Sequence, residues 1–260
     1  MKIHNTAIID KKAIVSSDAE IGAYCYVGPN VKIDTGCKLE RYCNVEGNTE
    51  IGKNNTFYPY VSIGTDPQDY SYNRGIKSFL KIGDNNIFRE YFTANVGAKE
   101  ESSTIIGNEN MFMINSHAGH NVEVGNNVII ANNSLLGGYV KVYDRVFISG
   151  NCCVHQFCRV GYMAMISGGV AISLDLPPFL ISASRNTADG INLVAMKRNN
   201  LKLDSVKVVK QLYKMFIGSD LNTGDAVIKA KEKIVQRFES KTFLDFVENT
   251  KRGIIRHHRI

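Results

Sequence analysis

The stretch IGAYCYVGPNVKIDTGCKLERYCNVEGNTEIGKNNTFYPYVSIG, residues 21–64, places an apolar residue at every sixth position. The same phase begins at Ile9 and runs unbroken to Ile63, resumes at Ile82, and after a second interruption continues from Ile106 to Ile172, so that 25 hexads share it. A period of six matches neither the 3.6-residue turn of an α-helix nor the two-residue alternation of an ordinary strand. It indicates short strands joined by tight corners.

Small or β-branched residues stand two positions before most of these apolar residues, and Gly often follows directly, as at Gly22, Gly28 and Gly52. Glycine supplies the permissive backbone that a tight corner needs. Three hexads then close a triangular coil of about 18 residues, and stacked coils bury a continuous apolar column. The sequence therefore predicts a parallel β-helix over residues 1–184, with loop insertions near 66–80 and 97–103 where the period fails.

This repeat resembles that of the hexapeptide-repeat transferases, whose fold is a left-handed parallel β-helix. The left hand is implied by that resemblance, because periodicity alone does not give it. The expected fold is thus a left-handed parallel β-helix followed by a small C-terminal α-helical domain.

Five of the six cysteines occupy the small inward position of a hexad, and only Cys153 does not. A buried cysteine behaves as a small apolar side chain. The chain has no CxxC spacing. We therefore expect these residues to pack the column rather than to bind metal or form disulfides.

The pair Pro177-Pro178 is expected to end the β-helix, because two adjacent prolines cannot join a hydrogen-bonded ladder. Beyond Asn186 the pattern becomes helical, which predicts a basic α-helical domain over residues 185–260. One helix is expected over 190–198, a second capped by Asp204, and two more near 223–238 and 241–251. Residues 256–259 are expected to form a frayed tail.

The net charge of +6 is unevenly distributed. Residues 1–184 carry 15 Lys or Arg against 17 Asp or Glu, whereas residues 185–260 carry 16 against 8. A basic patch of this size suits nucleic acid, an acidic carrier protein or ligand phosphates. No apolar run is long enough to cross a membrane and the N-terminus lacks the pattern of a signal peptide, so the expectation is a cytoplasmic protein without membrane insertion.

His120, Gly138 and Gln156 are spaced by 18 residues, which predicts a vertical row at one corner of the β-helix. His117 should point outward beside His120, and His155 precedes Gln156. A histidine below a glycine N–H suits acyl transfer, with the imidazole as general base and the N–H as oxyanion donor. No Ser or Cys in the row is paired with a base, which favours direct attack. Alternatively, these histidines could bind zinc. The i, i+3 spacing of His117 and His120 is poor for that purpose at this corner, so we expect no metal.

Several motifs are more specific about function than the spacing of these residues. They resemble the signature of the UDP-N-acetylglucosamine acyltransferases that open lipid A biosynthesis, and they run from about residue 4 to residue 254. The matching segments are Arg89-Glu90, Met113 to His120, Ile130 to Asn133, Val154 to Cys158, Asp175 to Phe179, Met196 to Arg198 and Arg252 to Ile254, together with Pro67-Gln68-Asp69 in the first loop.

This resemblance implies a role for each matched residue. His120 would be the general base, Asp69 would bind sugar hydroxyls and help to hold that base, and Gly138 would supply the oxyanion N–H. The positions implied to bind substrate are His117, His155 and Gln156 around the donor and acceptor, Gln68, Asn192 and Arg198 at the phosphates, and Gly168 at the floor of the acyl groove. It also implies no bound cofactor, a phosphopantetheine-linked acyl group on an acyl carrier protein as co-substrate, a nucleotide sugar as acceptor, and a homotrimer with active sites between subunits.

Two residues depart from the family pattern. Asn95 and Tyr139 stand where the best-known members have histidine, at positions that line the acceptor site. Both the hydroxyl of N-acetylglucosamine and the amine of an amino sugar therefore stay open as acceptors.

Two other functions compete with this one. The chain can be an N-acyltransferase that uses acyl-CoA or acetyl-CoA on a UDP- or dTDP-linked amino sugar. It can also be a scaffold or nucleic-acid-binding trimer, although no aromatic residues are interleaved with the basic ones for base stacking. Of the three partners suggested by charge, an acidic carrier fits best and nucleic acid fits least.

Overall fold

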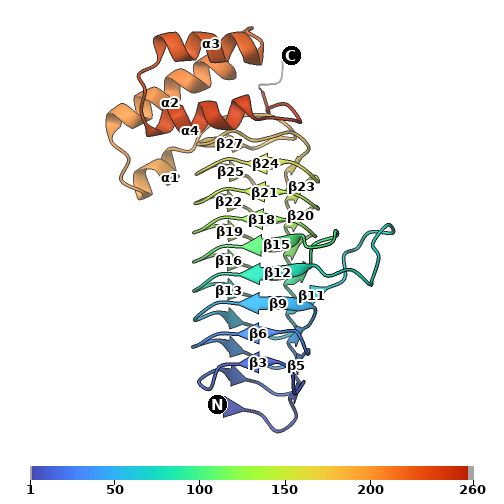
Figure 1. The fold of residues 1–260 in the computed structure, drawn as a ribbon. Helices are drawn as coiled ribbons and strands as arrows, with labels where there is room; N and C mark the ends of the chain where they lie inside the picture. Colours follow the sequence, from blue (N-terminus) through green and yellow to red (C-terminus); the bar gives the residue numbers. More distant parts are fainter. Residues whose placement is uncertain (1, 257–260) are drawn as a thin grey trace.

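The structure is a computed structural model that describes residues 2–256. Its first two thirds form a three-sided β-helix, and four helices cover the C-terminal end of that prism (Figure 1). Successive strands contribute in turn to three sheets, which we call sheets 1, 2 and 3 and which are parallel except for β28 at the end of sheet 1. Sheet 1 has the order β1-β4-β7-β10-β13-β16-β19-β22-β25-β27-β28, sheet 2 runs from β2 to β26 in steps of three, and sheet 3 runs from β3 to β24 in the same way.

The strands are short, because each side of the triangle holds only a few residues before a corner. They are β1 (Lys2–Ile3), β2 (Ile8–Ile9), β3 (Ile14–Val15), β4 (Glu20–Ile21), β5 (Tyr26–Val27), β6 (Lys32–Ile33), β7 (Lys38–Leu39), β8 (Asn44–Val45), β9 (Asn48–Ile51), β10 (Thr56–Phe57), β11 (Ser62–Thr65), β12 (Phe79–Ile82), β13 (Ile87–Phe88), β14 (Thr93–Asn95), β15 (Ser103–Ile106), β16 (Met111–Phe112), β17 (His117–Ala118), β18 (Glu123–Val124), β19 (Ile129–Ile130), β20 (Leu135–Leu136), β21 (Lys141–Val142), β22 (Phe147–Ile148), β23 (Cys153–Val154), β24 (Arg159–Val160), β25 (Met165–Ile166), β26 (Ala171–Ile172), β27 (Leu180–Ser182) and β28 (Gly190–Ile191).

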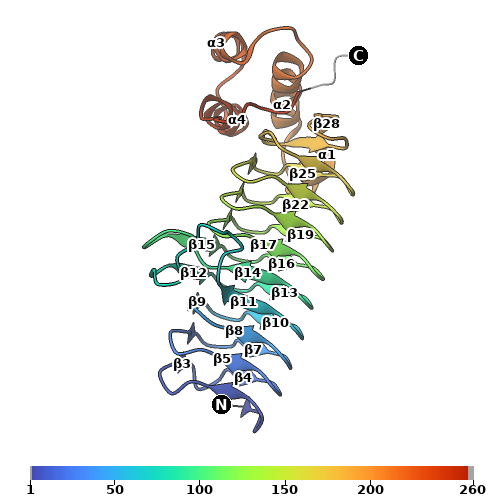
Figure 2. The same ribbon diagram turned by 90° about the vertical axis from the view of Figure 1, so that its right-hand side faces the viewer.

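The register confirms the predicted coil. Ala118 pairs with Leu136 and Leu136 with Val154, each 18 residues along the chain. The spacing grows only where a loop leaves the prism. It is 31 between Ile63 and Ala94, across the segment 66–78, and 24 between Ala94 and Ala118, across the segment 96–102. Both loops follow strands of sheet 2, so they leave from the same corner (Figures 1 and 2).

The apolar residues of the hexads fill the prism as a continuous column. Phe57, Phe88 and Phe112 are fully buried and stack with ring centroids 4.7 and 5.3 Å apart. The column also contains the five cysteines at the small inward positions, and Cys153 is exposed as expected. Burial raises the pKa of the Cys158 thiol to about 11, which keeps it protonated and unreactive. All six cysteines are free thiols.

The helices are α1 (Leu193–Arg198), α2 (Leu203–Phe216), α3 (Thr223–Lys233) and α4 (Phe238–Glu248). The prediction of one helix over 190–198 is wrong at its start, because Gly190–Ile191 form β28, antiparallel to β27. Asp204 does not cap α2 either. Lys202 holds the N-cap position, and the Asp204 carboxylate lies in the first turn, 3.2 Å from Lys207 Nζ.

The coil also continues past the prolines. After Pro177-Pro178 the chain enters β27, which pairs in parallel with β25. At the other end of the domain, Arg256 is not frayed, since its guanidinium donates to Leu221 O at 2.8 Å and Thr223 Oγ1 at 2.7 Å. Residues 257–259 of the predicted tail lie outside the described part of the chain.

An ion pair with a buried carboxylate and a partly buried guanidinium joins the helices to the last coils. The Asp175 carboxylate is 1% exposed and lies 2.7 Å from Arg159 Nη2. It also accepts a hydrogen bond from Thr250 Oγ1, and Arg159 donates to Phe246 O at 2.9 Å while its guanidinium stacks on the Phe246 ring. The helical layer is therefore one packed unit with the prism. Among the described residues, no helix is long and apolar enough to span a membrane.

Candidate active site

The predicted site residues gather mainly at the corner that follows the strands of sheet 2. His117 lies in β17, and His120 follows that strand; Gly138 and Tyr139 follow β20, while His155 and Gln156 follow β23. The two loops leave from the same corner one and two coils below. The hexad repeat therefore places the candidate base, the candidate oxyanion donor and both loops along one edge of the prism (Figure 2).

His120 and Gly138 are in direct contact, as their spacing predicted. Tyr139 N donates to His120 O at 3.0 Å, and Phe157 N donates to Gly138 O at 3.0 Å, so the three coils stack in register. A Cβ atom at Gly138 would lie 2.6 Å from both Cε1 and Nε2 of His120. Gly138 thus makes room for the imidazole. Within residues 2–256 its own N–H makes no hydrogen bond, which leaves that donor available to a ligand.

Asp69 lies in the exposed loop 66–78. Its carboxylate accepts hydrogen bonds from Ser71 N at 2.9 Å and Ser71 Oγ at 2.8 Å. These bonds, and to a smaller degree the charge of His120, hold the pKa of Asp69 below its ordinary value. The anionic form of Asp69 is therefore favoured. Gln68 is exposed beside it, while Pro67 is buried.

Asn95 holds the root of this loop. Its Nδ2 donates to Thr65 Oγ1 at 2.9 Å and Asp66 O at 2.8 Å, and its side chain is only 3% exposed. This position therefore supports the loop from below instead of presenting a group at the open surface.

His117 is half-buried beside His120, with Nδ1 2.8 Å from Thr93 Oγ1. Burial, opposed in part by the Thr93 contact, lowers the pKa of His117. Its neutral form is consequently favoured in the folded protein.

Two aromatic side chains, Tyr139 and Phe157, follow His120 along the same corner on the next two coils. Tyr139 meets the His120 ring edge-on with centroids 5.2 Å apart, and it stacks on Phe157 at 4.9 Å. The Lys99 ammonium lies 5.9 Å from the Tyr139 ring centroid, which brings a cation from the second loop to the same surface. His155 and Gln156 are exposed at the next coil.

Three predicted residues lie elsewhere on this chain. Gly168 follows β25 of sheet 1 and is exposed, with no atom nearer than Gly150 O at 3.6 Å to a Cβ placed there. Asn192 is buried, caps α1 by accepting from Ala195 N, and donates to Met163 O. Arg198 is exposed at the end of α1. The structure of one chain does not bring these three to His120.

A hollow of about 280 Å³ adjoins the row on the outer face of sheet 2. Its lining is mostly apolar, with Leu135, Cys153 and Ala171 in register on successive strands and His155 at its edge. Such a strip suits an alkyl chain more than a polar ligand.

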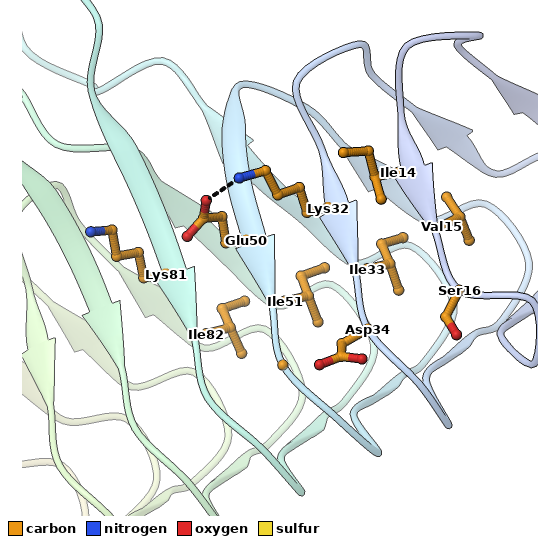
Figure 3. Close-up of a pocket in the computed structure, with 11 residues that line it drawn as sticks. Ile14, Val15, Ser16, Lys32, Ile33, Asp34, Glu50, Ile51, Lys81 and Ile82 are labelled. Atoms are coloured by element: carbon orange, nitrogen blue, oxygen red, sulfur yellow. Dashed lines mark hydrogen bonds and ion pairs between the residues drawn. The ribbon is translucent and has the colours of Figure 1, made fainter.

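A larger hollow of about 620 Å³ lies on sheet 3 near the N-terminus, and Figure 3 shows its lining. Its polar groups include Lys32 and Glu50, which form an exposed ion pair at 2.7 Å. No histidine lines it, so it offers no general base of that kind. Across residues 2–256, no three His, Cys, Asp or Glu side chains gather as a metal site requires.

Two residues of the site escaped the sequence analysis. Asn121 directly follows His120, and Lys99 belongs to the polar segment 99–103 that interrupts the repeat. Both could have been found from the sequence. Asn121 is a polar residue next to the candidate base, and Lys99 is a cation in an insertion at the same corner as that base.

The fold and this corner define a hexapeptide-repeat transferase, and a family model described as bacterial transferase hexapeptide (six repeats) matches residues 103–138. A second model, described as UDP-N-acetylglucosamine O-acyltransferase, domain 2, matches residues 175–255.

The chain belongs to the UDP-N-acetylglucosamine O-acyltransferase family and is an acyltransferase. It is 37% identical to the acyl-[acyl-carrier-protein]–UDP-N-acetylglucosamine O-acyltransferase of Syntrophobacter fumaroxidans, over 98% of this chain and 100% of that protein. It is 40% identical to the enzyme of the same name from Thermodesulfovibrio yellowstonii, over 98% and 99%. The solved structure of LpxA from Acinetobacter baumannii has 36% identity and a TM-score of 0.94, with 98% of this chain and 99% of that chain covered.

Proposed function

We propose that this chain transfers a 3-hydroxyacyl group from the phosphopantetheine thioester of an acyl carrier protein to the 3-hydroxyl of UDP-N-acetylglucosamine, the first step of lipid A biosynthesis. The relatives are named as acyl-carrier-protein-dependent O-acyltransferases of this sugar nucleotide. Those names do not favour the alternative of an N-acyltransferase.

The contact of His120 with Gly138 is the observation that carries this proposal. His120 Nε2 takes the proton from the sugar hydroxyl as its oxygen attacks the thioester carbonyl. The unpaired Gly138 N–H stabilises the oxyanion that forms. Collapse of the tetrahedral intermediate breaks the C–S bond and expels the phosphopantetheine thiolate, which takes back from the His120 imidazolium the proton that the sugar hydroxyl had given up. Asp69 contacts sugar hydroxyls and stabilises the imidazolium, and Gln68 lies beside it in the loop.

The acyl chain would lie along the apolar strip beside His155, with Gln156, His117 and Tyr139 around the reacting groups. The exposed Arg198 suits a phosphate. No bound cofactor is needed for this chemistry.

The assembly proposed is a homotrimer. The positions of Gly168, Asn192 and Arg198 support it, because these residues complete a site with His120 only if they come from a neighbouring subunit. The winding proposed is left-handed, as in the hexapeptide-repeat transferases, and the location proposed is the cytoplasm. The excess of Lys and Arg beyond residue 184 suits an acidic carrier protein and not nucleic acid.

The test is a mass-spectrometric assay with UDP-N-acetylglucosamine and a 3-hydroxyacyl carrier protein. We expect an ester product, and we expect His120→Ala to lower kcat by roughly 10²- to 10⁴-fold. His4→Ala, on the first coils, is the matched control and should keep wild-type rates. Turnover of acetyl-CoA with a UDP- or dTDP-linked amino sugar, and none with the carrier protein, would replace this proposal with the N-acyltransferase.

A further inference from the structure

The second loop, residues 96–102, presents one cation to the row of the candidate base. The Lys99 ammonium lies 5.9 Å from the Tyr139 ring centroid, and the Tyr139 ring meets the His120 ring edge-on at 5.2 Å. A single aromatic ring therefore separates this cation from the imidazole. Among residues 2–256 the Lys99 ammonium has no ion-pair partner, which leaves its charge available to a ligand.

The backbone of this loop is held on both sides of Lys99. Lys99 N donates to Ser102 Oγ at 3.0 Å, and Ser102 N donates to Lys99 O at 3.0 Å. Just before it, Ala98 N donates to Asn121 Oδ1 at 2.8 Å. The lysine stem therefore starts from a fixed point beside the row, and only its own side-chain torsions have to be ordered when a ligand binds.

The acidic neighbours of Lys99 contact a different part of the molecule. Glu101 Oε1 lies 3.1 Å from Lys77 Nζ, and the Glu100 carboxylate accepts a hydrogen bond from Lys77 N at 3.0 Å. Both acids therefore contact the end of the first loop, whereas Lys99 contacts Tyr139. The second loop thus keeps its carboxylates with Lys77 and presents only its ammonium to the candidate site.

The substrates proposed for this site give that cation a purpose. Both substrates carry phosphate groups, whereas the first loop supplies Asp69, a carboxylate whose anionic form is favoured. Without a cation nearby, Asp69 would repel a diphosphate. A lysine ammonium is a compact point charge that suits a phosphate group. Arg198, the other cation proposed at the phosphates, stands at the end of α1, so Lys99 is the cation that shares a corner with His120.

We infer that Lys99 binds the diphosphate of the acceptor nucleotide sugar and so determines its affinity. This inference rests on the proposed function, in which the 3-hydroxyl of the sugar faces His120. The diphosphate is attached at C1, one sugar ring from that hydroxyl, and Lys99 is one aromatic ring from the imidazole. The phosphate of the acyl donor is at the far end of the long phosphopantetheine arm, so it lies away from Lys99 while the thioester is beside Gly138.

The binding test is isothermal titration calorimetry of the full chain with UDP-N-acetylglucosamine. Lys99→Met keeps a long stem without the charge, and we expect the Kd to rise about 10-fold, as for the loss of one charge-assisted hydrogen bond. Lys99→Arg keeps the charge and should restore most of the affinity. Added salt should weaken binding to the wild type more than binding to Lys99→Met, because salt screens an attraction that the variant lacks.

The matched control is Lys81→Met. Lys81 also lies over an aromatic ring, 5.4 Å from the Phe79 centroid, but it belongs to β12 of sheet 3 and not to the corner of His120. This variant should bind UDP-N-acetylglucosamine as the wild type does. In the acyl-transfer assay, Lys99→Met should raise the KM for the nucleotide sugar about 10-fold and change kcat and the KM for the carrier protein less than about threefold, because the contact is present in both the ground state and the transition state.

The two assays distinguish a failure of this inference from a failure of the proposed function. A Kd for UDP-N-acetylglucosamine within twofold of wild type in Lys99→Met, or an equal loss of affinity in Lys81→Met, would overturn the inference. A rise confined to the KM for the carrier protein would also overturn it, because that result would assign Lys99 to the donor. Binding of the nucleotide sugar that depends on Lys99, without acyl transfer by the wild type, would instead support the inference and refute the proposed function alone.

Discussion

A single methyl group added at Gly138 should separate catalysis from stability. The Cβ of Gly138→Ala would lie 2.6 Å from His120 Cε1 and Nε2, whereas ordinary contact begins at 3.4 Å. The imidazole therefore has to move by about 0.8 Å, the difference between these distances. Gly138 is not among the glycines with positive φ, so alanine adds no backbone strain at this position.

The expected loss follows from that displacement. A misplacement of about 1 Å in a reacting group costs on the order of 10²-fold in rate, which corresponds to ~2.7 kcal/mol. The alanine variant keeps its backbone N–H, so the oxyanion donor survives and the loss reports the position of the base. Because a side chain yields instead of the backbone, the free energy of unfolding should change by less than about 1 kcal/mol.

The assay measures kcat for acyl transfer from 3-hydroxyacyl carrier protein to UDP-N-acetylglucosamine, alongside urea unfolding. Gly190→Ala is the matched control, because a Cβ there meets no atom within 4 Å. A Gly138→Ala enzyme with kcat within threefold of wild type would show that the imidazole does not need its present position. An equal loss in Gly190→Ala would attribute the effect to something other than His120.

Three more predictions concern other parts of the chain. Asp175→Ala leaves the Arg159 guanidinium, which is 16% exposed, without its fully buried carboxylate partner and should lower the free energy of unfolding by about 3–5 kcal/mol in urea titrations; a change under 1 kcal/mol would contradict this account. The folded pKa of His117 lies below its ordinary 6.5, so the unfolded chain binds more protons and stability should fall as pH drops below about 6.5; His117→Gln should flatten that slope. A Cβ at Gly168 would meet no atom nearer than 3.6 Å, so Gly168→Met should fold normally. In a competition assay the variant should prefer donors with shorter acyl chains. An unchanged preference would show that Gly168 does not line the acyl groove.

The hexads predicted the prism because its geometry depends on local repetition. An apolar residue such as Leu136 recurs at a fixed interval from Ala118 and Val154, and the register of sheet 2 follows directly. The same counting placed His120 under Gly138. Prediction succeeded where each coil is a copy of the one below it.

Prediction was weaker where contacts join dissimilar segments. Gly190–Ile191 read as helical, yet they form a strand because β27 offers an unpaired edge, which no local pattern reveals. Asp204 was predicted to be the N-cap, but the N-cap of α2 is two residues earlier, at Lys202, which has an extended conformation. The contact of Asn121 with Ala98 depends on how an insertion without hexads folds back onto the row.

Because the coils are stacked in register, the number of residues in each coil limits which insertions and deletions the sequence can accept. Deletion of one residue between His120 and Gly138 would turn every following side chain to the wrong face until the next corner absorbs the error. The corner after sheet 2 has already accepted 13 extra residues between Ile63 and Ala94, and 6 between Ala94 and Ala118, compared with the 18 of a plain coil. Related sequences should therefore differ in length at these two loops and keep a constant count across the row.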